Sequence, residues 1–311
     1  MHALRRTPEP EARVVDDFIR NGAHVFPEPL DARAAAELLD AIRKLRRFDA
    51  TLFLTEAEFD ADPRYVGVNP RPGRNLLEGF GRELDFVERD PQITGALTGL
   101  LGADYQILNK KVVCGVPDSA VPDWLKARIK GNPVNNLGAF VRPEVRDVTY
   151  FYGIDFHQDL IDFRDRDADF LTLYVYLHPV GPQDAPLYLL EGSHALGATL
   201  FPHALSPDGA GHWRYEDGAG QARRVRQQVL TGQAGYAAIW HPCTLHGTQP
   251  DAADHERISL RYLVARGAAS WSGIDRVNAT LAGPLRLSTT RVDLGDDGQA
   301  RIRGNVVNGA A

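Results

Sequence analysis

The chain has 311 residues, of which 43% are hydrophobic and 24% charged, and its formal net charge is −6. These values are close to those of an average soluble globular protein, and the length suits two ordinary domains or one large sheet-based domain. The acidic balance gives no electrostatic reason to expect nucleic acid or an anionic membrane as a partner.

The N-terminal residues and the cysteines indicate a cellular compartment. Residues 1–17 have no apolar core of the signal-peptide type. No run of about 18 apolar residues, the length of a membrane span, occurs in the chain. Cys114 and Cys243 are too few for a disulfide framework and lack zinc-finger spacing. We therefore expect a cytoplasmic protein without a membrane span, present as a monomer or a homodimer.

The first part of the chain is predicted to be helical. Residues 11–21 form a short amphipathic pattern, and residues 31–48 give the strongest helix signal. Asp31 can cap that second helix, and basic residues crowd its last turns, where they complement the helix dipole. Residues 90–102 suit a third helix, capped by Asp90 and ended by Gly102.

After about residue 103 the sequence becomes rich in β-forming residues. Residues 116–150 contain several prolines and many turn-forming residues, which indicates an insertion or lid. From residue 148, short β runs alternate with Gly, Pro and Asp turns, a pattern typical of an antiparallel sandwich or barrel. The runs are residues 148–156, 170–180, 185–192, 223–232, 235–242 and 257–265. The predicted fold class is therefore mainly β with N-terminal helices.

We expect one domain over residues 1–311, because the N-terminal helices hold too little apolar surface to form a separate domain with its own core. Residues 1–102 would be a helical support, and residues 103–266 a β core that carries the insertion 116–150. Residues 267–311 would be a C-terminal extension, whose Gly- and Asp-rich end suits one hairpin.

His157 and Asp159 raise the possibility of a metal site. Side chains two apart on a strand share a face, so these two would project together while Gln158 turns away. An imidazole and a carboxylate are two-thirds of the facial triad of non-haem Fe(II) oxygenases. The motif alone is weak, since 10 His and 41 acidic residues give roughly one such tripeptide by chance. The alternative is an interior histidine hydrogen-bonded to a carboxylate.

The downstream sequence supplies a third ligand and an anion site. His246 comes just after a β run, and residue 257 follows it by eleven positions. Arg257, Ser259 and Arg261 would share one strand face, where a guanidinium and a hydroxyl can bind a carboxylate. A dicarboxylate co-substrate that chelates iron through one end could bind its distal carboxylate at this site. The alternative is that Arg257 or Arg261 merely pairs with an acidic neighbour.

In this combination the sequence resembles the phytanoyl-CoA dioxygenase-like family of Fe(II)/2-oxoglutarate oxygenases. The resemblance covers roughly residues 105–266. It implies a double-stranded β-helix (jelly-roll, cupin-like) fold that uses Fe(II), 2-oxoglutarate and O2. It also implies that His157, Asp159 and His246 bind the iron and that Arg257, with Ser259, binds the distal carboxylate of 2-oxoglutarate.

Further site residues are suggested less directly. The family usually contributes a polar side chain from an earlier strand, here Gln106 or Asn109; at most one can face the site, and we favour Asn109. Thr244, two residues before His246, is another candidate for 2-oxoglutarate. Four apolar or aromatic residues are candidates for substrate binding, although ordinary core packing would explain them equally well. They are Phe156, Leu160, Tyr152 and Trp124.

The expected activity is oxidation of an unactivated C–H bond of a small molecule, with release of succinate and CO2. Hydroxylation of a natural-product intermediate or an amino-acid derivative is the main hypothesis; desaturation, cyclisation and epimerisation remain open. Related aliphatic halogenases have Ala or Gly in place of the carboxylate, so Asp159 disfavours halogenation. Two rival functions are a redox-neutral cupin-type metal enzyme, which would not need Arg257, and a non-catalytic jelly-roll binding protein.

Overall fold

The computed structural model describes residues 10–61, 75–249, 255–268, 271–295 and 301. The helices are α1 (Pro10–Asn21), α2 (Ala32–Leu45), α3 (Glu56–Ala61), α4 (Asp85–Glu88), α5 (Pro91–Leu101), α6 (Asp123–Ile129) and α7 (Gly273–Asn278). Within this described part, no helix is long and apolar enough to cross a membrane. The hairpin expected near the C-terminus falls largely outside the described residues.

The strands begin between the first two helices and continue through most of the chain. They are β1 (Ala23–Val25), β2 (Gln106–Gly115), β3 (Val134–Asn136), β4 (Thr149–His157), β5 (Phe170–Tyr176), β6 (Leu187–Glu191), β7 (Ala204–Pro207), β8 (His212–Glu216), β9 (Ala222–Leu230), β10 (Ala237–Trp240), β11 (His246–Thr248) and β12 (Arg257–Ala265).

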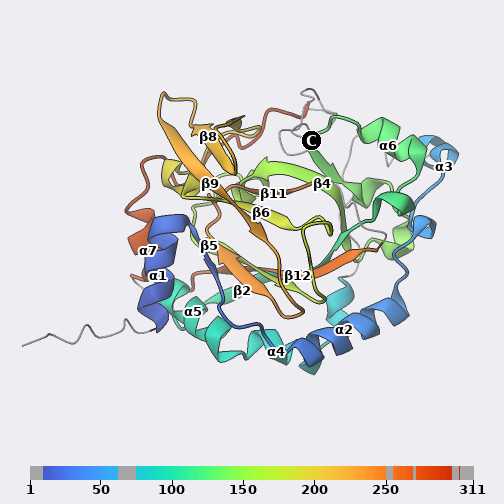
Figure 1. Cartoon of the computed structure of the whole chain (residues 1–311), viewed down its shortest axis with the longest axis horizontal. Coiled ribbons are helices and arrows are strands. Elements are labelled where there is room, and N and C mark those ends of the chain that lie inside the picture. Colours follow the sequence, from blue (N-terminus) through green and yellow to red (C-terminus); the bar gives the residue numbers. More distant parts are fainter. Residues whose placement is uncertain (1–9, 62–74, 250–254, 269–270, 296–300, 302–311) are drawn as a thin grey trace, which may run out of the picture.

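Within the described residues, these strands form one continuous twelve-stranded sheet in the order β1-β10-β5-β12-β2-β4-β11-β6-β9-β8-β7, with β3 added beside β4. All pairings are antiparallel except the short parallel contact of β2 with β4. In Figure 1, β2, β5 and β12 lie below β4, β6 and β11, so the sheet folds into two layers. The mainly β fold expected from the sequence is therefore confirmed.

The N-terminal helices cover the outer side of the lower layer. Figure 1 shows α1, α2, α4 and α5 along that side, next to β2, β5 and β12. Ile258, Leu260 and Tyr262 of β12 are buried in the same hydrophobic cluster as Leu38 of α2 and Leu100 of α5. Because side chains alternate along a strand, the opposite face of β12 is left free for the interior between the layers.

Helix α2 is shorter than the sequence pattern indicates. It begins after the Asp31 cap as expected but ends at Leu45 instead of residue 48. Arg46 adopts an extended backbone (φ −141°, ψ 128°) and pairs with Asp147 at 2.5 Å. A tertiary ion pair thus accompanies the end of a helix that local propensity would extend.

Some elements were not predicted. The hairpin β7–β8 lies between the predicted β runs 185–192 and 223–232, where no strand was predicted, and α7 lies in the expected extension. In β8 the buried Trp213 and Tyr215 alternate with polar residues, which is a strand pattern. The pattern covers only five residues and is flanked by many Gly, Pro and Asp residues, so it was not recognised in the sequence.

We expect Asp31→Ala to lower the free energy of unfolding by about 1 kcal/mol. Asp31 Oδ1 accepts hydrogen bonds from the backbone N–H groups of Arg33 and Ala34 at 2.9 and 3.0 Å, and alanine leaves both without that partner. Urea unfolding followed by circular dichroism measures the change. The control is Glu37→Ala on the same helix, which removes only an exposed ion pair with Arg33 and should change stability little. Equal losses in the two variants would contradict the capping role.

Candidate functional site

The pairing of two short strand ends brings the three expected metal ligands together. His157 is the last residue of β4, His246 is the first of β11, and the two are direct partners across the antiparallel ladder. Their ring centroids lie 4.2 Å apart. Asp159 follows in a short 3₁₀ turn, and one ligand atom from each of the three residues lies within 4.8 Å of the others.

Hydrogen bonds and burial give both histidines the form that binds a metal. Nδ1 of His157 lies 2.9 Å from the carbonyl oxygen of Asp155, and Nδ1 of His246 lies 3.0 Å from that of Thr244. A carbonyl only accepts, so each Nδ1 carries the proton and each Nε2 keeps a lone pair. Burial lowers the pKa of both imidazoles, and for His157 the neighbouring His246 lowers it further. Both rings are therefore neutral at pH 7.

Asp159 is an ionised carboxylate held by several donors. Its Oδ2 accepts hydrogen bonds from Thr172 Oγ1 at 2.6 Å and from Trp240 Nε1 at 3.0 Å. Its Oδ1 accepts one from Arg261 Nη2. Burial by itself would raise the pKa of Asp159, but the opposing effects, of which the Arg261 guanidinium is the largest, hold the pKa below its ordinary value.

This donor set fits Fe(II). Two neutral imidazoles and one carboxylate are the ligands of the facial triad, which leaves open positions for a co-substrate and O2. Gln158, between two of the ligands, turns away and bonds the backbone of Gly197, Cys243 and Thr199, which anchors the turn. In the part of the chain that the structure describes, no other group of His, Cys, Asp or Glu converges in this way.

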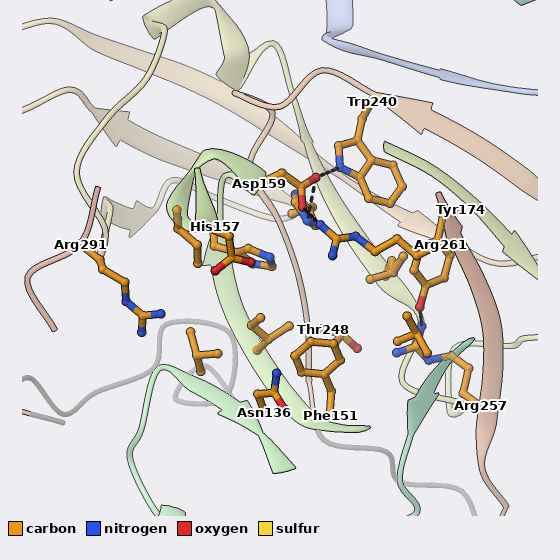
Figure 2. Close-up of a pocket in the computed structure, with 17 residues that line it drawn as sticks. Asn136, Phe151, His157, Asp159, Tyr174, Trp240, Thr248, Arg257, Arg261 and Arg291 are labelled. Carbon is orange, nitrogen blue, oxygen red and sulfur yellow. Dashed lines mark hydrogen bonds and ion pairs between the residues drawn. The ribbon is translucent and has the colours of Figure 1, made fainter. Parts of the chain in front are cut away.

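The triad opens into a cavity of about 130 Å³ between the two layers of the sheet (Figure 2). Its walls combine residues of the β core, two residues of β3 and Arg291 from the segment after α7. The 116–150 insertion therefore contributes to the cavity directly: β3 pairs with β4 and places Val134 and Asn136 in its lining.

Arg257 lies in the cavity wall beyond the triad. It is 1% exposed, and its Nη1 donates a hydrogen bond to Tyr174 Oη at 3.2 Å. Its cross-strand neighbour on β2 is Gly115, where a Cβ atom would lie only 3.2 Å from both Nε and Nη2 of the guanidinium. The glycine thus forms the recess in which the arginine rests. Ser259 is buried on the same strand face but does not line the cavity.

The other residues suggested for 2-oxoglutarate lie elsewhere. Asn109 is exposed on β2 opposite Leu263, and a bulge in the β2–β12 ladder follows this pair. Thr244 is buried, but its Oγ1 donates to the carbonyl oxygen of Gly22 at 2.7 Å. Neither residue lines the cavity.

The four residues suggested for substrate binding are also absent from the cavity lining. Phe156 packs on Trp213, and Trp124 packs with Phe59 and Phe140. Leu160 belongs to another buried cluster, and Tyr152 bonds Asp118. In three cases a sequence neighbour faces the cavity instead, and these neighbours are Phe151, His157 and Ile161. Adjacent side chains point to opposite sides, so being next to a metal ligand in the sequence does not show that a residue lines the cavity.

Several cavity residues had no role in the sequence-based prediction. Tyr174 and Trp240 lie on β5 and β10, and only the pairing of these strands brings them to the site. Arg261, by contrast, was noted because it shares the strand face of Arg257, and the alternative that it pairs with an acidic neighbour is confirmed by its hydrogen bond to Asp159. Arg291 had no sequence signal, since it comes from the expected C-terminal extension.

Comparison with known proteins agrees with this geometry. The phytanoyl-CoA dioxygenase (PhyH) family model matches residues 18–259. Among curated proteins, the chain is 24% identical over 195 residues to the probable alpha-ketoglutarate-dependent hypophosphite dioxygenase of Stutzerimonas stutzeri. That alignment covers 60% of this chain and 53% of the other, so the chain spans about half the length of this curated relative.

Solved structures are similar to this chain at low sequence identity. The non-haem alpha ketoglutarate-dependent carbocyclase SnoK from nogalamycin biosynthesis matches with a TM-score of 0.50 and 11% identity, over 88% of this chain and 92% of that one. The epimerase SnoN, in complex with Fe3+, alpha ketoglutarate and nogalamycin RO, matches with a TM-score of 0.49 and 18% identity, over 94% and 98%. The family match and the likeness to SnoK confirm the double-stranded β-helix core expected from the sequence.

The matched residues include both histidines and the aspartate of the triad as well as Arg257. Fe(II) and 2-oxoglutarate are therefore the cofactor and co-substrate of this protein, and the chain belongs to the phytanoyl-CoA dioxygenase (PhyH) family of Fe(II)/2-oxoglutarate-dependent oxygenases.

Proposed function

We propose that this oxygenase hydroxylates an unactivated C–H bond of a small molecule, in natural-product or amino-acid-derivative metabolism. The observation that supports this most is the presence of a complete His-Asp-His triad and a buried arginine in one cavity. A metal site alone would suit many reactions, but a buried guanidinium at the far wall suits a co-substrate with a second carboxylate.

In this proposal each residue has a defined task. His157, Asp159 and His246 hold Fe(II), while Trp240 and Thr172 orient the Asp159 carboxylate through their hydrogen bonds to Oδ2. Arg257 binds the distal carboxylate of 2-oxoglutarate, and Tyr174 orients that guanidinium. When bound, the iron and 2-oxoglutarate together with O2 supply the oxidising chemistry, with release of succinate and CO2.

The remaining walls control access of water. Val113, Ile154 and Leu187 are buried apolar residues of the cavity lining, and they surround the polar groups of the site. Excluding water in this way strengthens the charge interactions inside the cavity and limits side reactions of oxidising species.

Asp159 favours hydroxylation over halogenation, because its carboxylate occupies the ligand position that halide would need. Desaturation, cyclisation or epimerisation would use the same ligands and differ in how the substrate is placed. Arg257 argues against a redox-neutral cupin-type enzyme, which has no need of a dicarboxylate anchor. A purely structural role for the triad is disfavoured by the two Nε2 lone pairs that converge on the cavity.

Anaerobic addition of Fe(II) and then 2-oxoglutarate should produce the weak visible charge-transfer band of the chelate, and O2 should then yield succinate. We expect Asp159→Ala to abolish hydroxylation and to weaken iron binding by at least tenfold, because it removes one of three protein ligands. Iron affinity is measured by anaerobic titration. Asp167→Ala, an exposed aspartate of the nearby loop, is the control and should bind iron normally. Absence of the band in the unaltered protein would refute the proposed function.

We expect Gly115→Ala to raise the KM for 2-oxoglutarate by roughly tenfold, which corresponds to about 1.4 kcal/mol, with a smaller effect on kcat. The added Cβ would press on the Arg257 guanidinium at 3.2 Å and displace it from its recess. Steady-state succinate formation gives both constants. Gly95→Ala is the matched control, because a Cβ at that helical position meets nothing within 4 Å. An unchanged KM in Gly115→Ala would contradict the role assigned to Arg257.

A further inference from the structure

Three guanidinium groups line the cavity, those of Arg257, Arg261 and Arg291. Arg261 bonds the Asp159 carboxylate, and the proposed function assigns Arg257 to 2-oxoglutarate. Arg291 pairs with Asp293 just behind the wall and has no task in the proposed function. Its place in the lining raises the question of what it binds.

Arg291 is held in a fixed orientation on the side of the cavity opposite Arg257 (Figure 2). Its Nε and Nη2 donate to the two carboxylate oxygens of Asp293 at 2.8 and 2.7 Å, and Asp293 is 1% exposed. The guanidinium also lies over the Phe201 ring, 5.6 Å from its centroid. This two-point pairing leaves Nη1 outside the ion pair and fixes the plane of the group, which favours recognition of an oxyanion.

Asn136 provides a second donor from β3. Its Oδ1 accepts a hydrogen bond from the backbone N–H of Gly138 at 2.9 Å. That bond uses the acceptor end of the amide, so the NH2 end is available to the cavity, into which Figure 2 shows the side chain pointing. Arg291 and Asn136 thus offer hydrogen-bond donors on the part of the wall that is away from Arg257.

We propose that the substrate of this enzyme is a small organic oxyanion, a carboxylate or phosphonate, whose anionic group binds Arg291 and Asn136. This inference rests on the proposed function and names the substrate class of the same site. One charged donor and one amide donor at the same end of the cavity suit an oxyanion, which accepts hydrogen bonds from both. Arg291 lies beyond residues 18–259 that the family model matches, so this subsite belongs to the chain's own C-terminal segment.

The competing role for Arg291 is structural: with Asp293 it would merely fasten the C-terminal segment to the β core. Backbone bonds already attach this segment, since Phe201 N donates to Thr290 O at 3.0 Å and Val292 N donates to Phe201 O at 2.9 Å. A structural role predicts that removing Arg291 lowers stability and leaves ligand selectivity unchanged. A binding role predicts a loss of response to anions.

The test uses the full chain loaded anaerobically with Fe(II) and excess 2-oxoglutarate. Propionate, butyrate, phenylacetate and methylphosphonate are titrated as probes, and each carboxylate is compared with its primary amide. Perturbation of the charge-transfer band and the shift of the thermal midpoint report binding. We expect the acids to give saturable responses and the amides none; the phosphonate arm shows which oxyanion is preferred. Persistence of the band shows that 2-oxoglutarate still occupies the Arg257 end.

Arg291→Gln should weaken binding of the acids at least tenfold while leaving the 2-oxoglutarate band intact. Because this change leaves the Asp293 carboxylate buried without its partner, the double variant Arg291→Gln with Asp293→Asn is measured as well; it removes both charges and keeps the segment neutral. Arg286→Gln, an exposed arginine of the same segment, is the control and should bind the acids normally. Circular dichroism confirms that each variant is folded.

The outcomes separate the two proposals. If the band forms but no acid binds, or if amides bind as well as acids, the anionic substrate class is wrong and the proposed function stands. Normal binding of acids by the double variant also overturns the subsite. If the unaltered protein forms no band at all, both this inference and the proposed function fail.

Discussion

The pairing of β11 with β4 is the constraint on which the site depends. It sets His246 directly opposite His157, and the turn after β4 then brings Asp159 beside both. The two strands approach so closely that a Cβ on Gly247 would lie 2.9 Å from the carbonyl oxygen of Ile154. A glycine after the second histidine therefore allows the ladder to close, and the ladder holds the ligands at a separation that suits one metal ion.

The interior of the fold carries charges that an apolar core would not tolerate. Asp159 and Arg257 are almost fully buried, and each is stabilised by polar neighbours: Thr172, Trp240 and Arg261 around the carboxylate, and Tyr174 beside the guanidinium. The helices cover the apolar outer face of β12, so that face forms part of the hydrophobic core while the inner face carries the polar residues. One strand thus contributes to the hydrophobic core on one side and to the chemistry on the other.

The site was predictable where local spacing determines direction and unpredictable where the strands are irregular. Arg257 and Arg261 share a direction because both lie on one strand. His157 and Asp159 do converge, but not for the reason expected, since Asp159 lies in the 3₁₀ turn after β4 and not on the strand. Along β4 such counting fails, because Gly153 has a positive φ of 71° and the ladder with β11 shifts register. Phe151, Ile154 and His157 consequently all reach the cavity at a spacing of three, while Tyr152 and Phe156 do not. A bulge beside Asn109 has a similar effect on β2.

The sequence by itself determined the fold class, the helical support and the identity of the triad, because each is encoded by residues close together or by a motif order that a known family shares. Only the tertiary structure decided which side chains surround that triad. Tyr174, Trp240, Asn136 and Arg291 come from four separate segments, and their convergence depends on strand pairing and on the path of the C-terminal segment. No periodicity within one segment carries that information, since the contacts form between residues far apart in the chain.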